Sequence, residues 1–424
     1  MKSLLALVLA AGLVSSARAT PDPLEAQARR FVVLATSLGR LRPKEIDAYW
    51  GPPELDMRKR GPAPSLASLR RDLTRLRGDV ARDVPSRRRD RLGARLDHLI
   101  ALLDVIEKPR AQGFNRQARQ VYGMSAPPDA KALPPAALDQ LLPGHGDLTG
   151  RLAAWRAHFA IPQTRRKAVF LRALEECRAR TLAHWPLPAD EKLDVVWSMD
   201  VPAAWHRYRG HHQSLLLINP GAVADPASAL DVACHEAYPG HHVQFVAMEV
   251  AAGPQGLPVE DTVVILRSPE QVLREGAANY GVDLAFPASA RLTFMRDVLF
   301  PLAGFDRRQA ASFVQVHRAV GDLTRSVLPI LRDYYDGRIA SGDALARLVL
   351  DAQVSSPEAL LEFTRDMGAY VSGYTVARDI VAACVHARSH PALDRWQALH
   401  EIVTGPDVAI LDGSDNACAP YRGP

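Results

Sequence analysis

The chain has 424 residues, enough for one large domain or for two or three ordinary ones, and a hydrophobic content of 47% supports a substantial core. Its formal net charge of +5 is small, and its arginine runs are typical of solvated helix faces, so composition does not favour a nucleic-acid partner. Four cysteines are too few for a disulfide scaffold in a chain of this length.

The chain begins with the pattern of a secretory signal peptide. Lys2 precedes an apolar stretch over residues 4–14, and Ala17, Arg18 and Ala19 form a small-residue cleavage motif. We expect cleavage after Ala19 and a periplasmic or secreted mature protein; a membrane anchor or a buried first helix is the alternative. No later run approaches the roughly 20 apolar residues that span a bilayer, so stable membrane insertion is not expected.

Helical patterns dominate the rest of the chain. Residues 24–122 carry amphipathic patterns rich in Leu, Ala and Arg, broken by a turn at residues 50–53. A stretch rich in Pro, Ala and Gly follows over residues 124–150 and indicates a linker or an irregular crossing. The next pattern predicts one helix over residues 147–183.

The C-terminal half continues this pattern. Residues 307–390 are mostly helical, with a turn at residues 336–337. We therefore expect residues 20–424 to form a single large, mainly helical domain. Its helical N-terminal part extends to about residue 123, and a catalytic part over residues 151–424 follows the Pro-rich crossing.

Strands are predicted only in the middle of the chain. The runs Asp194–Ser198 and Ser214–Ile218 are short, apolar and bounded by turn residues, and we expect them to pair in a small sheet. The second run could offer backbone groups to an extended substrate, as edge strands do. A helix is then expected to begin after Asp225 and Pro226, a good N-cap followed by a proline at the first helical position.

The segment CHEAYPGHHVQ, residues 234–244, carries the chemistry. His235 and Glu236 are adjacent, and His241 and His242 follow beyond a Pro-Gly pair. Two imidazoles and a carboxylate in this spacing indicate a hydrolytic zinc site related to H-E-x-x-H, in which the histidines sit four residues apart on one helix face. The expected cofactor is Zn²⁺.

The Pro-Gly pair decides which histidine can join His235. On an unbroken helix His242 would lie about 10 Å along the axis from His235, too far for one ion. If the Pro-Gly pair loops two residues out, His241 takes the place of the second histidine of the motif. We favour His241 as the ligand and keep His242 as the alternative, or as a neighbour that orients a ligand.

Two carboxylates complete the expected site. Glu236 directly follows the first ligand and can face a water on the metal, which is the general-base position. The expected third ligand is Glu275, on a helix that opens with the capping pair Ser268 and Gln271 and has small residues beside Glu275. Asn279, one turn later, could orient a ligand histidine.

These residues resemble a known family. HEAYPGHHVQ, followed about 40 residues after His235 by REGAANY, is similar to the DUF885 family of bacterial proteins, and DAYWGPPEL and SLLLINPG extend the resemblance over most of the chain. That family is grouped with the zincin-like metallopeptidases, next to the helical gluzincins. The resemblance implies His235, His241 and Glu275 as zinc ligands and Glu236 as the base. It also implies a mainly α, zincin-like fold with a small β-sheet next to the metal-binding helix.

The resemblance also implies an oxyanion donor. In helical gluzincins a tyrosine from the C-terminal part stabilises the oxyanion, and by resemblance Tyr374 takes this role, with Tyr370 as the alternative. The two tyrosines are four residues apart and could share a helix face; packing in the core is the competing interpretation for both. Arg378 would share that face, where it either binds a substrate carboxylate or forms an ion pair with Asp379.

The expected function is that of an exported zinc-dependent metallohydrolase, most simply a peptidase acting on a peptide or small amide. One alternative is an inactive zincin-like protein that binds peptide or metal, and another is a hydrolase of non-peptide esters or amides. The intact Glu236 argues against the first alternative, because a binding module needs no base beside its metal. No oligomeric state is predicted.

The cysteines have separate expected roles. Cys384 and Cys418 can pair in an oxidising compartment, whereas Cys177 and Cys234 are expected to be small buried apolar groups. No pair has a C-x-x-C spacing, so a thiolate zinc site is not expected.

Overall fold

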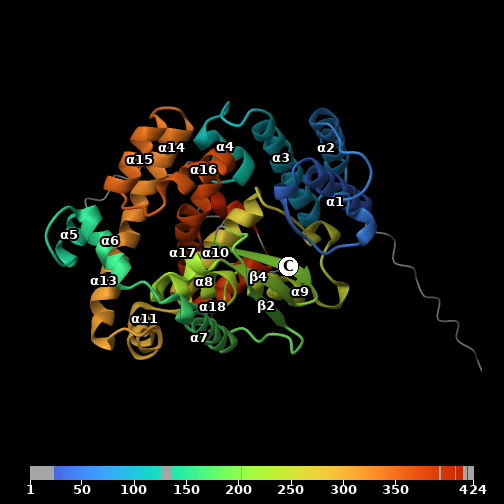
Figure 1. Ribbon diagram of the computed structural model, residues 1–424. Helices are drawn as coiled ribbons and strands as arrows, with labels where there is room; N and C mark the ends of the chain where they lie inside the picture. Colours follow the sequence, from blue (N-terminus) through green and yellow to red (C-terminus); the bar gives the residue numbers. More distant parts are fainter. Residues whose placement is uncertain are drawn as a thin grey trace, which may run out of the picture.

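Helices make up most of the molecule and enclose two small β-sheets (Figure 1). The computed structural model describes residues 23–125, 135–201, 203–390, 393–405, 407–413 and 418. The mainly α fold with a small sheet that the sequence predicts is confirmed. The predicted signal peptide, residues 1–19, lies outside these ranges. Within them, no helix combines the length and the apolar character needed to cross a membrane.

Four helices form the N-terminal part: α1 Pro23–Leu41, α2 Leu66–Ala81, α3 Arg87–Glu107 and α4 Phe114–Tyr122. Helices α2 and α3 each follow a serine whose hydroxyl accepts a hydrogen bond from the third backbone N–H of the helix. In α2 the apolar residues at positions 69, 73, 76 and 80 recur every three or four residues and are buried, so one face packs into the core.

The helix predicted over residues 147–183 is wrong in one respect, because two helices occupy this range. They are α6 Leu148–His158 and α7 Gln163–Leu182. Pro162 lies directly before α7, and a proline cannot continue the hydrogen bonding of the preceding helix because it has no backbone N–H. The first of the two begins where the prediction places it, and the Asp147 side chain caps it by accepting from a backbone N–H of α6.

The predicted crossing over residues 124–150 contains a short helix, α5 Ala136–Leu141. This helix packs against α13, Ala310–Leu323, in an apolar cluster separate from the main core. In Figure 1, α5, α6 and α13 lie on the side of the molecule opposite α1 and α2.

The main sheet has the strand order β2-β4-β3, with β2 Lys192–Trp197, β4 Gln213–Ile218 and β3 Ala204–Gly210. Strand β2 runs parallel to β4, and β3 runs antiparallel to it. The two predicted strands are confirmed as neighbours. Because β4 is the central strand, its backbone pairs on both sides, and the expectation that it offers an edge to an extended substrate is wrong.

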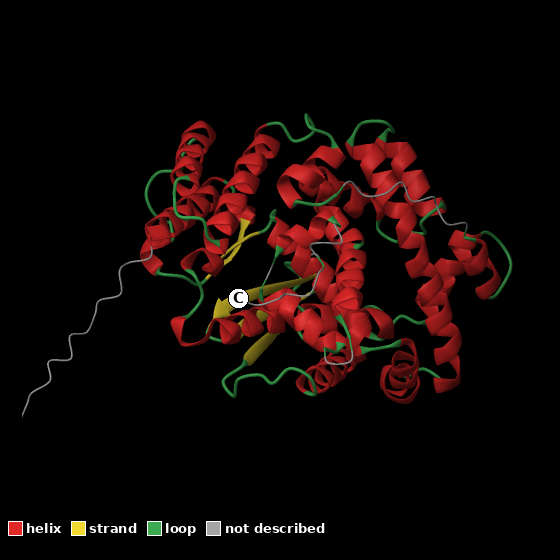
Figure 2. Cartoon of the chain, turned by 180° about the vertical axis from the view of Figure 1, so that it is seen from behind, coloured by secondary structure: helices red, strands yellow, loops and turns green. Residues whose placement is uncertain are grey.

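A second sheet pairs β1, Ile46–Tyr49, with β5, Val263–Ile265, in antiparallel orientation. Figure 2 shows both sheets as short yellow elements among the red helices. The prediction that strands occur only in the middle of the chain is therefore wrong. Runs of four and three residues are too short to show a period of two in the sequence, and their pairing joins distant segments.

Three helices beside the main sheet carry the motif residues: α8 Pro226–Glu236, α9 His241–Ala252 and α10 Pro269–Ala285. The predicted caps are confirmed. Asp225 and Ser228 form a reciprocal capping box at α8, and the Ser268 hydroxyl accepts a hydrogen bond from the backbone N–H of Gln271 at α10. These caps fix where α8 and α10 begin.

The C-terminal part is helical, as predicted: α11 Ala288–Phe294, α12 Phe300–Ala303, α13, α14 Val327–Tyr335, α15 Ser341–Leu350, α16 Pro357–Met367, α17 Val376–Arg388 and α18 Arg395–Thr404. Helix α17 packs against α10. A Cβ on Gly276 of α10 would lie 2.6 Å from the backbone of Ala377, so only glycine permits this approach.

Two disulfides join segments of the chain. Cys384 pairs with Cys418, as expected. Cys177 and Cys234 are buried, but the expectation that they are separate apolar groups is wrong, because they form a disulfide with a Cα–Cα distance of 5.4 Å. This bond ties α7 to α8 one residue before His235. The bond was missed because a sequence separation of 57 residues gives no sign of the contact between the two helices.

We predict that the Cys177–Cys234 disulfide contributes substantially to stability. Replacing both cysteines with alanine releases a loop of 57 residues in the unfolded chain, whose closure is worth about 4 kcal/mol in the chain-entropy account. Urea unfolding without reductant should show a loss of roughly 2–4 kcal/mol. Free thiols at both positions in the untreated protein, detected by alkylation and mass spectrometry, would contradict the assignment.

Candidate metal centre

The break between α8 and α9 brings two histidines of the motif together. Helix α8 ends at Glu236 and α9 begins at His241, so residues 237–240 form a turn between two helices. Gly240 donates its N–H to a carbonyl of α8 over 3.0 Å, and a Cβ on Gly240 would lie 1.7 Å from the carbonyl oxygen of His235. Only a glycine permits this approach, which folds the start of α9 onto the end of α8.

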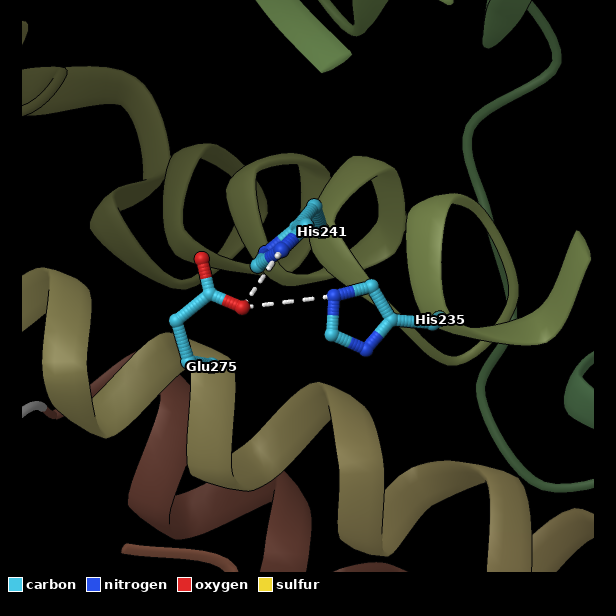
Figure 3. A group of neighbouring side chains, drawn as sticks. All are labelled: His235, His241 and Glu275. Atoms are coloured by element: carbon cyan, nitrogen blue, oxygen red, sulfur yellow. Dashed lines mark ion pairs between the residues drawn. The ribbon is translucent and has the colours of Figure 1, made fainter. Parts of the chain in front are cut away.

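His235, His241 and Glu275 converge on one point, as Figure 3 shows. Oε2 of Glu275 lies 3.3 Å from Nε2 of His235 and 3.6 Å from Nε2 of His241. His241 and Glu275 are buried, and His235 is partly buried. The structure thus brings together the three predicted ligand residues, one from each of α8, α9 and α10.

The spacing of these atoms fits an ion of the zinc type. Two ligand atoms that each lie about 2.1 Å from a tetrahedral ion stand about 3.4 Å apart, close to both separations. Oε2 of Glu275 is buried and has no hydrogen-bond donor in suitable geometry among the described residues. A buried carboxylate oxygen without a donor is costly, and a cation supplies the missing partner.

Asn279 sets the orientation of the first histidine. Its Nδ2 donates to the carbonyl of Tyr374 at 3.4 Å, so its Oδ1 faces His235. Nδ1 of His235 lies 3.1 Å from that oxygen and must donate to it, which leaves Nε2 of the neutral ring with a lone pair toward Glu275. Asn279 therefore contacts His235 as expected, and it selects the tautomer that metal binding through Nε2 would require.

Electrostatics favour positive charge at this point. Burial acts to lower the pKa of His235, but Glu275 and Glu236 outweigh it and raise this pKa to about 9. Burial acts to raise the pKa of Glu275, yet His241 and His235 hold it well below its ordinary value. The protein therefore holds the carboxylate of Glu275 ionised beside two imidazole rings, and a divalent cation could bind between these groups by displacing the Nε2 proton of His235.

Glu236 lies at the end of α8, directly after His235, and is partly buried. Burial raises its pKa above the ordinary value, and its charge interacts with His235, His241 and Glu275. A carboxylate with a raised pKa is a stronger base near neutral pH. Glu236 is therefore a candidate for proton transfer beside the three predicted ligand residues.

The two tyrosines occupy different environments. They lie in a 3₁₀ segment, Gly368–Tyr374, and the expected α-helical face is wrong. Tyr370 is buried and donates its hydroxyl to Oε1 of Glu275 at 3.1 Å, so it holds the carboxylate of Glu275 in place. Tyr374 is 41% exposed, and loss of hydration together with the charges of Glu275 and Glu236 raises its pKa well above the ordinary value. Of the two, only Tyr374 presents its side chain toward solvent near the site.

Arg378 forms ion pairs rather than a free carboxylate site. Its Nε donates to Asp283 at 3.0 Å and its Nη1 donates to Asp379 at 2.6 Å. Of the two roles considered for this arginine, the structure supports the ion pair. A substrate carboxylate would have to compete with both aspartates.

His242 lies in a buried chain of hydrogen bonds between protein groups and takes no part in the contacts among His235, His241 and Glu275. Its Nε2 lies 2.7 Å from Oε1 of Glu191 and its Nδ1 lies 2.8 Å from Oγ of Ser214. The same hydroxyl lies 2.8 Å from Nε2 of His206, whose ring stacks on that of His241. Both nitrogens of His242 are occupied by protein groups, so the structure favours His241 over His242 as the metal-facing histidine.

The chain of hydrogen bonds that includes His242 ends in a charged cluster around Glu191. Tyr238 donates its hydroxyl to Oε1 of Glu191, and Arg178 donates to Oε2 at 2.8 Å. Burial acts to raise the pKa of Glu191, but hydrogen bonds from His242, Tyr238 and Arg178 outweigh it and lower this pKa to about 2. The start of α9 is thereby anchored to the main sheet and to the segment before β2. Sequence patterns did not indicate Glu191, because a single glutamate in a loop looks like a solvated charge.

Asp47 is a further residue near the site that the sequence interpretation missed. It lies in β1 where the pairing with β5 shifts register between Ile46 and Ala48, an irregularity that can re-aim a side chain. Its Oδ1 accepts a hydrogen bond from the indole of Trp205 at 2.8 Å. Burial raises its pKa, and its charge interacts with that of His241. Asp47 opens the DAYWGPPEL segment, but nothing in the sequence places that segment beside the histidines.

Comparisons with known proteins add little to this geometry. The sequence matches no protein-family model and no curated protein. A solved structure described as "the putative lipoprotein from Colwellia psychrerythraea" is similar to 81% of the chain with a TM-score of 0.48 and 15% sequence identity. The chain spans 65% of the length of that protein.

We predict that Glu191 stabilises the protein in a pH-dependent way. Because its pKa is lowered to about 2 in the folded state, its contribution is fully present above its ordinary pKa of 4.5 and is lost as the pH falls toward 2. At pH 7, Glu191→Gln should cost about 2–3 kcal/mol of unfolding free energy, measured with urea, and this difference should shrink below pH 4.

The matched control for this measurement is Glu175→Gln, which changes a carboxylate whose side chain is 75% exposed. It should have little effect at either pH. A loss for Glu191→Gln that stays constant from pH 7 to pH 3 would show that packing, and not the ionised carboxylate, is responsible.

Proposed function

We propose that the protein is a zinc-dependent hydrolase of peptide or related amide bonds, and that it belongs to the zincin-like DUF885 family. The observation that carries this proposal is the convergence of His235, His241 and Glu275 on one point, with the carboxylate of Glu236 directly after the first histidine. Two imidazoles and one carboxylate are the protein ligands of a hydrolytic zinc site that keeps a position open for water. When bound there, zinc would polarise the substrate carbonyl and lower the pKa of water.

Other residues would transfer the proton, orient the ligand residues and stabilise the oxyanion. Glu236 takes the proton of the attacking water and returns it to the leaving nitrogen, so one carboxylate serves as base and then as acid. Asn279 holds the ring of His235, and Tyr370 holds the carboxylate of Glu275, so both ligand residues keep their orientation. Tyr374 is the candidate donor to the oxyanion, because its side chain is exposed and its raised pKa keeps the hydroxyl protonated at neutral pH.

A second candidate is a binding protein with the same scaffold and no turnover. The position of Glu236 weighs against it, since a purely structural zinc site is usually closed by a fourth protein ligand and needs no partly buried carboxylate beside it. We also propose that the protein acts outside the cytoplasm. Two disulfides support this location, because disulfides persist in oxidising compartments.

The decisive variant is Glu236→Gln, which keeps the size of the side chain and removes its ability to take a proton. On a panel of dipeptides, longer peptides and simple esters, we expect wild type loaded with zinc to hydrolyse an amide substrate. The variant should be about 10²–10⁴-fold slower while retaining the same zinc content. Glu175→Gln, far more exposed, should match wild type.

The outcomes separate the candidates. If zinc-loaded wild type cleaves no member of the panel, the binding protein becomes the better account. If only esters are cleaved, the hydrolase proposal holds and the peptidase assignment fails. If Glu236→Gln retains full turnover, the assigned base is wrong.

A further inference from the structure

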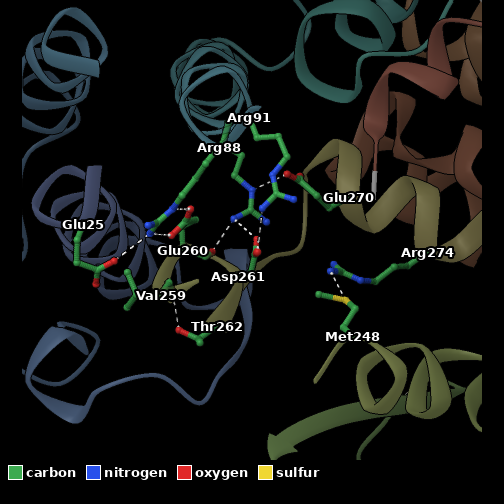
Figure 4. A network of polar contacts seen from close by, with 11 residues as sticks. Glu25, Arg88, Arg91, Met248, Val259, Glu260, Asp261, Thr262, Glu270 and Arg274 are labelled. Carbon is green, nitrogen blue, oxygen red and sulfur yellow. Dashed lines mark hydrogen bonds and ion pairs between the residues drawn. The ribbon is translucent and has the colours of Figure 1, made fainter. Parts of the chain in front are cut away.

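Arg274 is a buried cation that the proposed reaction does not use. It lies on α10 directly before Glu275 and is 7% exposed. Its Nη2 lies 3.5 Å from the sulfur of Met248 (Figure 4). Its Nη1 donates to the amide oxygen of Gln271 at 2.8 Å, and its guanidinium carbon lies 4.7 Å from the centroid of the Phe245 ring. These partners are neutral, and among the described residues no carboxylate forms an ion pair with Arg274.

A buried guanidinium without a counter-charge is unusual. Removing an ion from water costs several kcal/mol, and buried charges are therefore normally paired. Two neighbouring arginines follow this rule. Arg95 pairs with Glu270 at 2.7 Å and with Asp261 at 2.9 Å, and Arg267 pairs with Glu45 at 3.0 Å. Gln271, Met248 and Phe245 contact the guanidinium of Arg274, but because all three are neutral they do not balance its charge.

The side chain of Arg274 borders a cavity of about 20 Å³ between α3, β5 and the start of α10. The cavity lining includes three arginines, Arg95, Arg267 and Arg274, and one carboxylate, Glu270, which is already paired with Arg95. Ser268 and Pro269 add the positive end of the α10 helix dipole. Of these three arginines, Arg274 alone forms no ion pair among the described residues, and the charges of Glu270 and Asp261 act on it from further away.

The volume limits what can bind. A single water needs about 10–15 Å³ measured in this way, so a volume of about 20 Å³ leaves room for one small species. Positive charge, the end of a helix dipole and room for one small particle are the features of a site for a small inorganic anion.

We propose that this cavity binds a monovalent inorganic anion of the halide class, with Arg274 as its principal ligand. The anion balances the charge of Arg274 and links it to Arg95 and to the first turn of α10. Because the same helix carries Glu275, anion binding stabilises the helix that supplies a residue of the metal centre. This inference does not depend on the proposed hydrolase activity, since charge and cavity volume carry it without reference to turnover.

The direct test is crystallographic and uses the unmodified protein. Crystals grown without chloride and transferred to sodium bromide should give an anomalous bromine peak inside the cavity, in contact with the guanidinium of Arg274. Absence of a bromine peak in the cavity, or peaks only on the protein surface, would overturn the proposal. This measurement needs neither bound metal nor a substrate.

A solution experiment tests the role of Arg274 itself. At constant ionic strength, replacing sodium gluconate with sodium chloride should raise the urea midpoint of wild type in a saturable way, because an anion that binds only the folded state stabilises it. Arg274→Gln should lose this response. Arg378→Gln, a change of the same kind at an arginine already paired with two aspartates, should keep it. An equal chloride response in Arg274→Gln and wild type would exclude Arg274 as the ligand.

Discussion

The candidate metal centre depends on one close contact, the approach of Gly240 to the carbonyl groups at the end of α8. Because no side chain can fit between them, α9 starts beside the end of α8 instead of continuing it, and His241 comes to face His235. Oε2 of Glu275 lies at the same point, 3.3 Å from Nε2 of His235 and 3.6 Å from Nε2 of His241. The caps, the sheet and the disulfide serve to hold these three helices in place.

The supports around this contact come from different directions and bear on different residues. The Cys177–Cys234 disulfide fixes α8 from the side of α7, one residue before the first histidine. The hydrogen bonds that link Glu191, His242 and Ser214 fix the start of α9 against the sheet. Asn279, on α10, orients His235 across the gap between two helices. Loss of any one support should loosen a single member of the site, while loss of the Gly240 contact would separate both histidines.

Much of this arrangement could be predicted from local sequence. The caps at Asp225 and Ser268, the motif around His235 and the glutamate on α10 are short-range patterns, and the helix starts that they predict are confirmed. What could not be predicted depends on contacts between distant segments. Strands β1 and β5, the partner of Cys234, and the places of Glu191 and Asp47 follow from which helices and strands lie side by side. The proline before α7 is visible in the sequence, but the helical pattern on both sides of it predicts a single element.

The central claim is that His235, His241 and Glu275 form a metal site from which His242 is excluded, and metal stoichiometry tests it most directly. Wild type, His241→Gln, His242→Gln and Glu275→Gln would be stripped with a chelator, reloaded with zinc, desalted and analysed by mass spectrometry, with folding checked by circular dichroism. The account predicts one zinc per chain in wild type and in His242→Gln, and loss of most zinc in the other two variants. No bound zinc in wild type, or loss in His242→Gln with retention in His241→Gln, would contradict it.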